Sequence, residues 1–423
     1  MTTTIHLAPT VVPVSAPPIR DGGVVSRQGR IIDVGERDRL TASYPDAEKC
    51  EWQGVMVPGL VNAHTHLQYT SFSSVGSVRH PDYVTWSARF VEEYEERRND
   101  DWAQSARDGV HASLRNGTTC FADIVTDVAA LGILDEMGVA GVAYLEVIGV
   151  DEEAWKSHVE ETLASTVAEA PISGDSTVGI SPHAPYSLDE PVLKHLARLA
   201  NDMGRRLHIH LAESDTEDDY YRNGRGALAE RVAMRVGRPW GVLGRGGTGM
   251  GAAEFAESCG LLGPTTHVAH GVYLGKDGRR ILRERNTTTA LCPRSNLGVG
   301  IDPPPIRAFL EEGNPIAVGT DSLGSSPSLD LMADVALLYD LARDQGYQGE
   351  DLAPRLLRAA TIGGAEAMGT RGAVGELVAG ARADLAVFDV DPVPDQVLES
   401  LVTQGASRCS ATVVAGETRY RRT

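Results

Sequence analysis

Short apolar runs alternate with helical stretches through the middle of the chain, and this alternation limits the possible folds more than any other feature. The apolar runs cover residues 119–124, 139–145, 178–181, 207–212, 266–269, 288–291 and 316–319. Helical patterns lie between them, for example over residues 101–116 and 191–203. Strands that alternate with helices form a parallel sheet. About eight such units in one chain fit a (β/α)₈ TIM barrel better than an open sheet.

The two ends of the chain have a different pattern, in which short strands lie beside turn residues. Such strands are predicted for residues 22–26, 29–34, 384–389 and 412–416, the first two as a hairpin around Arg27-Gln28-Gly29. We therefore predict an α/β protein with two domains. Residues 1–57 and 371–423 form a small β-sandwich domain built from both termini, and residues 58–370 form the barrel.

Residues 222–263 are rich in glycine and arginine and follow one of the predicted barrel strands. We expect a long, mobile loop with some helix there. Long loops at the C-terminal face of a barrel are usually functional, so this segment is a candidate to close over a site.

The composition excludes several classes of partner. The chain holds 58 acidic and 39 basic side chains, for a net charge of -19, which disfavours nucleic acid and anionic membranes. No run approaches the roughly 18 apolar residues of a membrane span, and Met1–His6 lacks the pattern of a secretory signal. The five cysteines are scattered without a Cys-x-x-Cys pair, so neither a disulfide framework nor a zinc finger is indicated. We expect a cytoplasmic protein with reduced thiols.

His64 and His66 follow an apolar run, residues 55–61, that is interpreted as a strand buried on both faces. Side chains two apart on a strand point to the same side, so two imidazoles at one strand end can bind one metal ion. A single His-x-His pair is weak support for a metal site, because such pairs more often lie on the surface or in a core. The later strands decide between these alternatives.

Further metal-binding and acid–base side chains come at the ends of later predicted strands. They are His183, His210, Glu213, His270 and Asp321. TIM barrels keep their active sites at the C-terminal ends of the strands, where these side chains would meet. Three histidines and an aspartate with one open position form a catalytic site for Zn²⁺ or Fe²⁺. The best set of ligands for one divalent metal is His64, His66, His210 and Asp321.

Several neighbours of these residues have structural interpretations. His208 faces the same side as His210 but one layer deeper, and we assign it, like His267, a structural role. No lysine lies at a strand end, which disfavours a two-metal site bridged by a carbamylated lysine. Glu213 either carries protons beside the metal or is one of a group of surface acids. That group is Asp215, Glu217, Asp218 and Asp219.

Six motifs together resemble the amidohydrolase superfamily, specifically its aminohydrolase and chlorohydrolase branch, over nearly the whole chain. They are Pro58-Gly59-Leu60-Val61-Asn62-Ala63-His64-Thr65-His66, Ser181-Pro182-His183-Ala184-Pro185-Tyr186, His210-Leu211-Ala212-Glu213-Ser214, His270-Gly271-Val272, Cys292-Pro293-Arg294-Ser295-Asn296 and Gly319-Thr320-Asp321-Ser322. The resemblance implies a distorted barrel with a β-sandwich from both termini. It also implies one bound divalent metal, zinc in preference to iron or manganese.

The resemblance further implies hydrolytic deamination of a heterocycle. The metal lowers the pKa of its water, and the resulting hydroxide attacks the amino-bearing ring carbon while Asp321 accepts a proton. Glu213 delivers a proton to the adjacent ring nitrogen, His270 hydrogen-bonds the developing oxygen, and ammonia leaves. His183 contacts the substrate. Some triazine hydrolases of the branch lack the strand-eight aspartate, so the presence of Asp321 favours a deaminase.

Three segments, residues 181–186, 292–296 and 321–330, are most similar to the aminofutalosine deaminases of menaquinone biosynthesis. Those enzymes act on 6-aminodeoxyfutalosine, an adenine nucleoside whose ribose carries a carboxyphenyl ketone. Arg294 is interpreted either as the partner of the substrate carboxylate or as part of a buried structural ion pair. Asn296 is counted among the substrate contacts. Tyr186, with Trp86 and Phe90, either lines an aromatic pocket or packs in the core.

Other enzymes of the branch stay open as alternatives. They are S-adenosylhomocysteine or methylthioadenosine deaminases, guanine or cytosine deaminases, triazine-type chlorohydrolases and imidazolonepropionase-like enzymes. A non-catalytic scaffold is disfavoured, because such a protein would be expected to have lost some of the ligands that are all present here. By analogy with the branch, we expect a homodimer that binds a small heterocycle or nucleoside.

Overall fold

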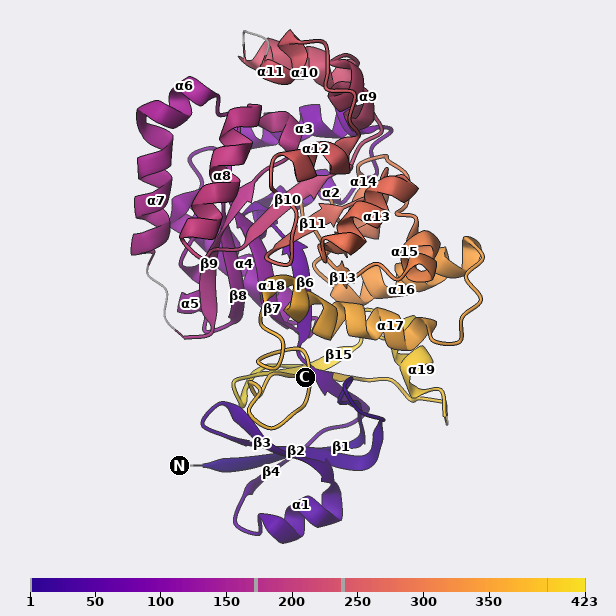
Figure 1. Cartoon of the computed structure of the whole chain (residues 1–423). Helices are drawn as coiled ribbons and strands as arrows, with labels where there is room; N and C mark the ends of the chain where they lie inside the picture. Colours follow the sequence, from indigo (N-terminus) through magenta and orange to yellow (C-terminus); the bar gives the residue numbers. More distant parts are fainter. Residues whose placement is uncertain (1, 171–173, 237–239, 394, 423) are drawn as a thin grey trace.

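The computed structural model describes residues 2–170, 174–236, 240–393 and 395–422. Eight parallel strands form one of its two sheets (Figure 1). The strands are β6 (Leu60–Thr65), β7 (Thr118–Val125), β8 (Ala140–Val147), β9 (Ser176–Pro182), β10 (Leu207–Leu211), β11 (Thr266–His270), β12 (Thr288–Leu291) and β13 (Ile316–Val318). Each strand pairs with the next one in the sequence, so all the C-terminal ends lie at one edge. The predicted barrel is confirmed.

The first and last barrel strands are joined by polar contacts at their C-terminal ends. The Asp321 N–H donates to the His64 carbonyl over 3.0 Å. The Asn62 amide donates to the Thr320 hydroxyl over 2.8 Å and accepts from the Thr320 N–H over 3.2 Å. Asn62 and Thr320 are fully buried, so these bonds satisfy groups that would otherwise destabilise the core. The closure brings His64 and Asp321 side by side.

Helices cover the outside of the barrel. Capping residues at their ends and apolar side chains at helical spacing explain why these segments are helical. The Asp101 carboxylate accepts from the Gln104 N–H at the start of α4 (Trp102–Leu114). In α8 (Glu190–Asp202), the buried side chains are Val192, Leu193, Leu196 and Ala200, a stripe with helical spacing. None of the helices in the described part of the chain is long and apolar enough to cross a membrane.

The remaining helices fill the connections. They are α1 (Arg37–Ser43), α2 (Ser73–Gly76), α3 (Tyr83–Arg97), α5 (Ile133–Glu136), α6 (Glu152–Ala154), α7 (Glu160–Glu169), α9 (Thr216–Asn223), α10 (Ala227–Val236), α11 (Gly241–Gly244), α12 (Ala252–Ser258), α13 (Lys276–Glu284), α14 (Pro293–Gly298), α15 (Ile306–Glu312), α16 (Leu331–Asp344), α17 (Leu352–Arg358), α18 (Gly364–Met368) and α19 (Val397–Gln404). The segment 222–263 was expected to be a loop with some helix, and it holds three of these helices, α10 to α12. Residues 237–239 of that segment lie outside the described residues, and its mobility stays a prediction.

Both termini contribute to the second sheet, which lies below the barrel in Figure 1. Its strands are β1 (Thr3–Val11), β2 (Ile19–Arg27), β3 (Arg30–Glu36), β4 (Glu48–Glu51), β5 (Val55–Pro58), β14 (Leu385–Phe388), β15 (Cys409–Val414) and β16 (Glu417–Arg421). The order is β16-β15-β14-β5-β1-β2-β3, with β4 also on β1. The predicted hairpin is confirmed, since β2 pairs antiparallel with β3 across Gln28 and Gly29. The exact division at residues 57 and 370 stays a prediction.

The apolar run 55–61 is two strands rather than the single strand that the sequence suggested. β5 pairs with β14 in the terminal sheet, whereas β6 pairs with β7 in the barrel. The chain passes between the sheets at Gly59, where an added Cβ would lie 2.1 Å from the Thr119 Oγ1. Only glycine fits this crossing, and an apolar pattern alone does not reveal which sheet a strand joins.

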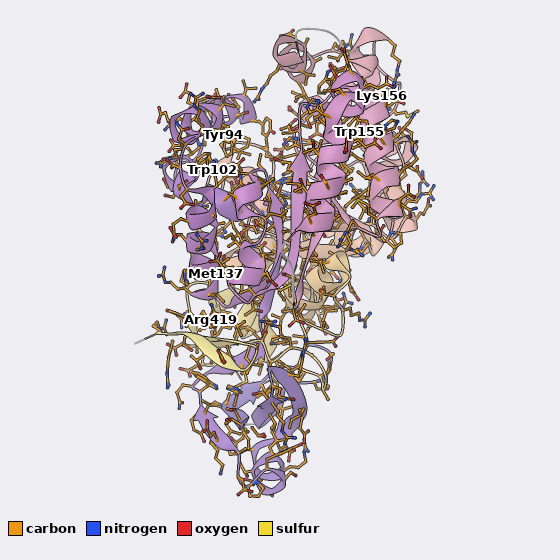
Figure 2. All side chains as sticks on the ribbon, turned by 90° about the vertical axis from the view of Figure 1, so that its left-hand side faces the viewer. Tyr94, Trp102, Met137, Trp155, Lys156 and Arg419 are labelled. Carbon is orange, nitrogen blue, oxygen red and sulfur yellow. The ribbon has the colours of Figure 1, made fainter. Side chains whose placement is uncertain are left out.

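Direct contacts hold the terminal sheet against the barrel. Figure 2 shows Arg419 of β16 close to Met137, and the Arg419 guanidinium donates to the Met137 carbonyl over 3.0 Å. The largely buried Arg382 pairs with Asp384 over 3.0 Å and also with Asp175, which follows α7 in the barrel. In the same view, Tyr94 lies beside Trp102 in an aromatic cluster under α3, with ring centroids 5.7 Å apart.

Candidate active site

Four of the predicted side chains meet at the C-terminal edge of the barrel. His64 lies on β6, His66 just after it, His210 on β10, and Asp321 after β13. The Nε2 atoms of His66 and His210 are 3.3 Å apart. The Asp321 Oδ1 is 3.6 Å from the Nε2 atoms of both His64 and His66. All four residues are buried. The ligand atoms of His64, His66 and His210 lie close enough together to hold one cation, and so do those of His64, His270 and Asp321.

The protonation state of this cluster suits a divalent metal. Burial lowers the pKa of His66 to about 3 and that of His64 well below its usual value, so these imidazoles are neutral at pH 7. The pKa of Asp321 lies well below its usual range, although burial alone would raise it. The buried His64 Nε2 has no hydrogen-bond partner among the described residues. Neutral imidazoles and a carboxylate around one point are the donors that Zn²⁺ requires.

A chain of hydrogen bonds fixes which nitrogen of His64 carries the lone pair. The His208 Nδ1 lies 3.1 Å from the His267 carbonyl, which can only accept, so this nitrogen carries the proton. The His208 Nε2 must then accept from the His64 Nδ1, 2.8 Å away. The lone pair of His64 is therefore on Nε2, which faces Asp321. The structural role expected for His208 thus includes orienting a ligand of the cluster.

His210 is held in the same way. Its Nδ1 donates over 2.8 Å to the carbonyl of His183, which leaves the lone pair on the Nε2 that faces His66. The side chain of His183 lies against the cluster as well, with its ring centroid 4.9 Å from that of His210. Its Nδ1 is 2.9 Å from the Ser187 hydroxyl.

Glu213 and His270 lie beside the metal-binding cluster. The Glu213 Oε1 is 3.7 Å from the His270 Nε2, and its Oε2 accepts from the Tyr83 hydroxyl over 3.2 Å. Glu213 is only 5% exposed, which excludes the surface-acid interpretation. Burial raises the pKa of Glu213 well above its usual value, and the charge of Asp321 raises it further. The pKa values of the two carboxyl groups are thus shifted in opposite directions, that of Glu213 upward and that of Asp321 downward.

The short helix α14 contacts both Asp321 and His270. The Ser295 hydroxyl donates to the Asp321 Oδ2 over 2.7 Å, which turns the Oδ1 toward the histidines. The Asn296 amide nitrogen lies 3.1 Å from the His270 Nδ1. Because that amide nitrogen can only donate, the ring proton of neutral His270 sits on Nε2, toward Glu213. Asn296 thus contacts a site histidine, and its predicted contact with the substrate stays a prediction.

Arg294 is the clearest difference from the sequence analysis. Its Nε and Nη2 bind the buried Asp334 carboxylate at 2.9 and 2.8 Å. Its Nη1 donates to the Ser328 hydroxyl over 2.8 Å, and its Nη2 also donates to the carbonyls of Ser328 and Asp330. Each guanidinium nitrogen has a protein acceptor, so Arg294 forms the buried ion pair rather than a substrate contact.

Aromatic side chains lie on the other side of Glu213. The Tyr186 hydroxyl is 3.4 Å from that of Tyr83, so Tyr186 lies next to the group that bonds Glu213. The Trp86 indole donates to the Gly324 carbonyl over 2.8 Å. Phe90 packs between Trp86 and Tyr69, at centroid distances of 5.5 and 5.1 Å. Tyr186 thus borders the site, whereas Phe90 belongs to a packed cluster.

The sequence analysis missed three residues at this site. Tyr83 lies in a helix without a motif, so nothing in the sequence pointed to it. Ser295 lies within a quoted motif, but its partner Asp321 is distant in the sequence, after β13. Asp123 could have been noticed as a carboxylate on an otherwise apolar strand. Its Oδ1 accepts from the Leu67 N–H over 2.8 Å, directly after His66.

The raised pKa of Asp123 can be tested through the pH dependence of the free energy of unfolding. Burial raises its pKa to about 8 in the folded state, compared with about 3.9 when unfolded. The folded state therefore binds one more proton between these values, and stability falls as the pH rises through this window. Asparagine is neutral at every pH. The free energy of unfolding of Asp123→Asn should therefore rise relative to that of the parent between about pH 5 and about pH 8, by at most about 1.4 kcal/mol per pH unit.

Chemical denaturation of both proteins at several pH values measures this difference. The exposed Asp108, on α4, supplies the matched control Asp108→Asn, whose difference from the parent should be constant with pH. A constant difference for Asp123→Asn as well would show that Asp123 is ionised in the folded protein.

Comparisons with known proteins agree with this geometry. The chain matches the amidohydrolase family over residues 55–418, and an imidazolonepropionase-like composite domain of bacteria over residues 22–47. It is 30% identical over 407 residues to a 5-methylthioadenosine/S-adenosylhomocysteine deaminase of Natronomonas pharaonis, covering 93% of this chain and 86% of that protein.

Solved structures share the fold. The aminofutalosine deaminase of Helicobacter pylori, in complex with methylthio-coformycin, superimposes with a TM-score of 0.85 at 21% identity, over 99% of this chain and 100% of that one. A zinc-bound adenosine deaminase of Xanthomonas campestris has a TM-score of 0.79 at 22% identity, over 99% of this chain and 93% of that one. The chain therefore belongs to the amidohydrolase family, in its aminohydrolase and chlorohydrolase branch, and is a hydrolase that acts on carbon–nitrogen bonds.

Proposed function

We propose that the protein is a metal-dependent hydrolytic deaminase of an adenine nucleoside. The observation that carries this proposal is the pair formed by Glu213 and Asp321, two buried carboxyl groups whose pKa values move in opposite directions. In the proposed reaction, Glu213 gives a proton and Asp321 takes one. Such a pair assigns the acid and the base of a hydrolytic reaction.

The roles of the individual residues follow from their positions. A divalent metal, zinc by preference, held by His64, His66, His210 and Asp321 would supply a water of lowered pKa as nucleophile. The ionised Asp321 takes a proton from the attacking water. The protonated Glu213 gives one to the ring nitrogen beside the reacting carbon. The proton held by Asp321 then passes to the amino group, which leaves as ammonia, while Glu213 takes back a proton from the new hydroxyl. The Nε2–H of His270 stabilises the oxygen on which charge develops.

The substrate proposed is 6-aminodeoxyfutalosine, which would place the enzyme in menaquinone biosynthesis. The support is the similarity of residues 181–186 and 321–330 to aminofutalosine deaminases, and the fold shared with the Helicobacter pylori enzyme. His183 and Tyr186, which border the site, are the proposed substrate contacts. We also propose a cytoplasmic location, in line with five cysteines that are all described and all free, and a homodimer.

A second candidate is the deamination of 5′-methylthioadenosine or S-adenosylhomocysteine. The Natronomonas pharaonis relative, whose name gives this activity, is 30% identical to the chain over most of both lengths. All of these substrates carry the same aminopurine, so the catalytic groups described above would serve each of them. The difference lies in what binds the group on the ribose.

Ammonia release from a panel of purified substrates separates these proposals. The panel holds 6-aminodeoxyfutalosine, 5′-methylthioadenosine, S-adenosylhomocysteine, adenosine, guanine and cytosine. We expect kcat/KM for 6-aminodeoxyfutalosine to exceed the other values by at least about tenfold, or about 1.4 kcal/mol of transition-state binding. Equal or better turnover of another adenine nucleoside would reject this substrate and keep the reaction. Turnover of guanine or cytosine alone would reject the adenine nucleoside.

A further inference from the structure

Glu217 is buried next to the active site, although the sequence analysis placed it among surface acids. It lies in the first turn of α9 and is 2% exposed, whereas its neighbour Asp218 faces solvent. A buried carboxylate is costly unless hydrogen bonds satisfy it. Its partners therefore show what it does.

The Glu217 carboxylate accepts three backbone hydrogen bonds from consecutive residues. Its Oε2 accepts from the Ala212 N–H over 2.9 Å. Its Oε1 accepts from the N–H groups of Glu213 and Ser214 over 2.7 and 3.1 Å. The middle one of these three residues is the proposed proton donor. One side chain thus holds the backbone on both sides of Glu213.

The local backbone needs such a partner. β10 ends at Leu211, so the N–H groups that follow have no neighbouring strand to bond. Ala212 has a φ of 51°, in the left-handed region that a residue with a side chain avoids. The carbonyls of Leu211 and Ala212 accept from the N–H groups of Gly271 and Tyr273. This turn is therefore held from the carbonyl side by the segment after β11 and from the N–H side by Glu217.

The charge of Glu217 also acts on Glu213. After burial and the charge of Asp321, the carboxylate of Glu217 is the next cause that raises the pKa of Glu213. Burial raises the pKa of Glu217 itself to about 7, against the lowering effect of its three backbone bonds. Both glutamates are buried, and the charge of Glu217 favours the protonated form of Glu213.

We propose that Glu217 is a positioning residue for catalysis, whose carboxylate fixes the turn 212–214 and thereby the side chain of Glu213. This inference rests on the proposed function only through the role given to Glu213. It makes no use of the metal ligands, so a loss of positioning should leave metal binding unchanged.

The test compares Glu217→Gln and Glu217→Asp with the parent, using the nucleoside that the parent deaminates best. The control is Asp218→Asn, on the adjacent exposed position of α9, where the carboxylate pairs with Arg222. For each protein, kcat, KM, metal content and unfolding temperature are measured. Amide hydrogen exchange of residues 212–214 is followed in parallel, because it needs no substrate.

We expect Glu217→Gln to lower kcat about 100-fold, with KM within about threefold and one metal per chain retained, because removing an oriented acid typically costs 10²–10⁴-fold. Exchange of the amides of residues 212–214 should accelerate at least about tenfold, since an amide group offers one acceptor oxygen in place of two. Glu217→Asp, which keeps both oxygens on a shorter side chain, should recover about tenfold in kcat and stay about tenfold below the parent. Asp218→Asn should match the parent.

Three results would overturn the inference: an unchanged kcat in Glu217→Gln, a loss of activity that follows a loss of metal, or unchanged exchange of the three amides. Should Glu217→Gln fail to fold, Glu217→Asp alone decides, because a merely structural role would leave its kcat at the parent value once it is folded. If the parent deaminates no nucleoside, the proposed function fails, and amide exchange alone then decides on Glu217.

Discussion

Replacing Glu213 with glutamine is expected to lower kcat about 1,000-fold while KM and bound metal stay close to the parent values. The glutamine keeps the shape of the side chain and the bond from Tyr83, but it cannot give up a proton to the substrate ring. General acid catalysis contributes about 10²–10⁴-fold in enzymes, and the expected loss lies in the middle of this range. Steady-state ammonia release and metal analysis of the purified variant measure both quantities.

The control for this variant lies two residues away. Asp215 is exposed in the same connection, and Asp215→Asn removes a carboxylate without touching the site. We expect its kcat to stay within about twofold of the parent, as for most surface substitutions. If Glu213→Gln also kept its activity, Glu213 would not be the proton donor, and the opposite pKa shifts of Glu213 and Asp321 would need another explanation.

Replacing His64 with alanine is expected to have the largest effect of all. It removes a proposed metal ligand whose Nε2 faces Asp321, and it leaves His208 without its hydrogen-bond partner in the core. We expect less than about one tenth of a metal per chain and activity at the background level. Mutation of a residue that only hydrogen-bonds a metal ligand already lowers metal affinity about 10–100-fold, and loss of a ligand should cost more. Elemental analysis after dialysis against a weak chelator measures the metal.

The unfolding temperature gives a second readout of this variant. A metal that binds only the folded state stabilises it by RT ln(1 + [L]/Kd), so adding zinc should raise the unfolding temperature of the parent but not that of His64→Ala. His111→Ala, at an exposed position of α4, should behave like the parent. Equal metal content in His64→Ala and the parent would reject the assigned ligand set.

Much of the site could be predicted because its residues follow the strands of a repeated strand–helix pattern. Parallel strands place their C-terminal ends at one edge, so any side chain that ends a strand is a candidate for the site. This reasoning brought together His64, His210 and Asp321, although they lie far apart in the sequence. The glycine at the crossing between β5 and β6 was hidden, because a run of buried strand residues looks the same in either sheet.

The sequence did not reveal the roles of residues whose partners are distant in the sequence. Arg294 lies in a motif that resembles a substrate-binding segment, but its charge is satisfied by Asp334 on α16. Glu217 looks like one acid among several on a polar helix, and only the path of the chain after β10 shows that three backbone N–H groups face it. A sequence pattern gives the type and spacing of side chains. It does not give the long-range contacts that decide whether a charged group meets the substrate or the protein.

The central claim is that water replaces the amino group of an adenine nucleoside at this site. Mass spectrometry of the products formed in ¹⁸O-labelled water tests it most directly, with the zinc-loaded parent and with Asp321→Asn. We predict one ¹⁸O atom in the purine of the product for each ammonia released by the parent, and no product above background with Asp321→Asn. Cleavage of the glycosidic bond, ammonia without ¹⁸O in the ring, or equal turnover by the two proteins would contradict the account.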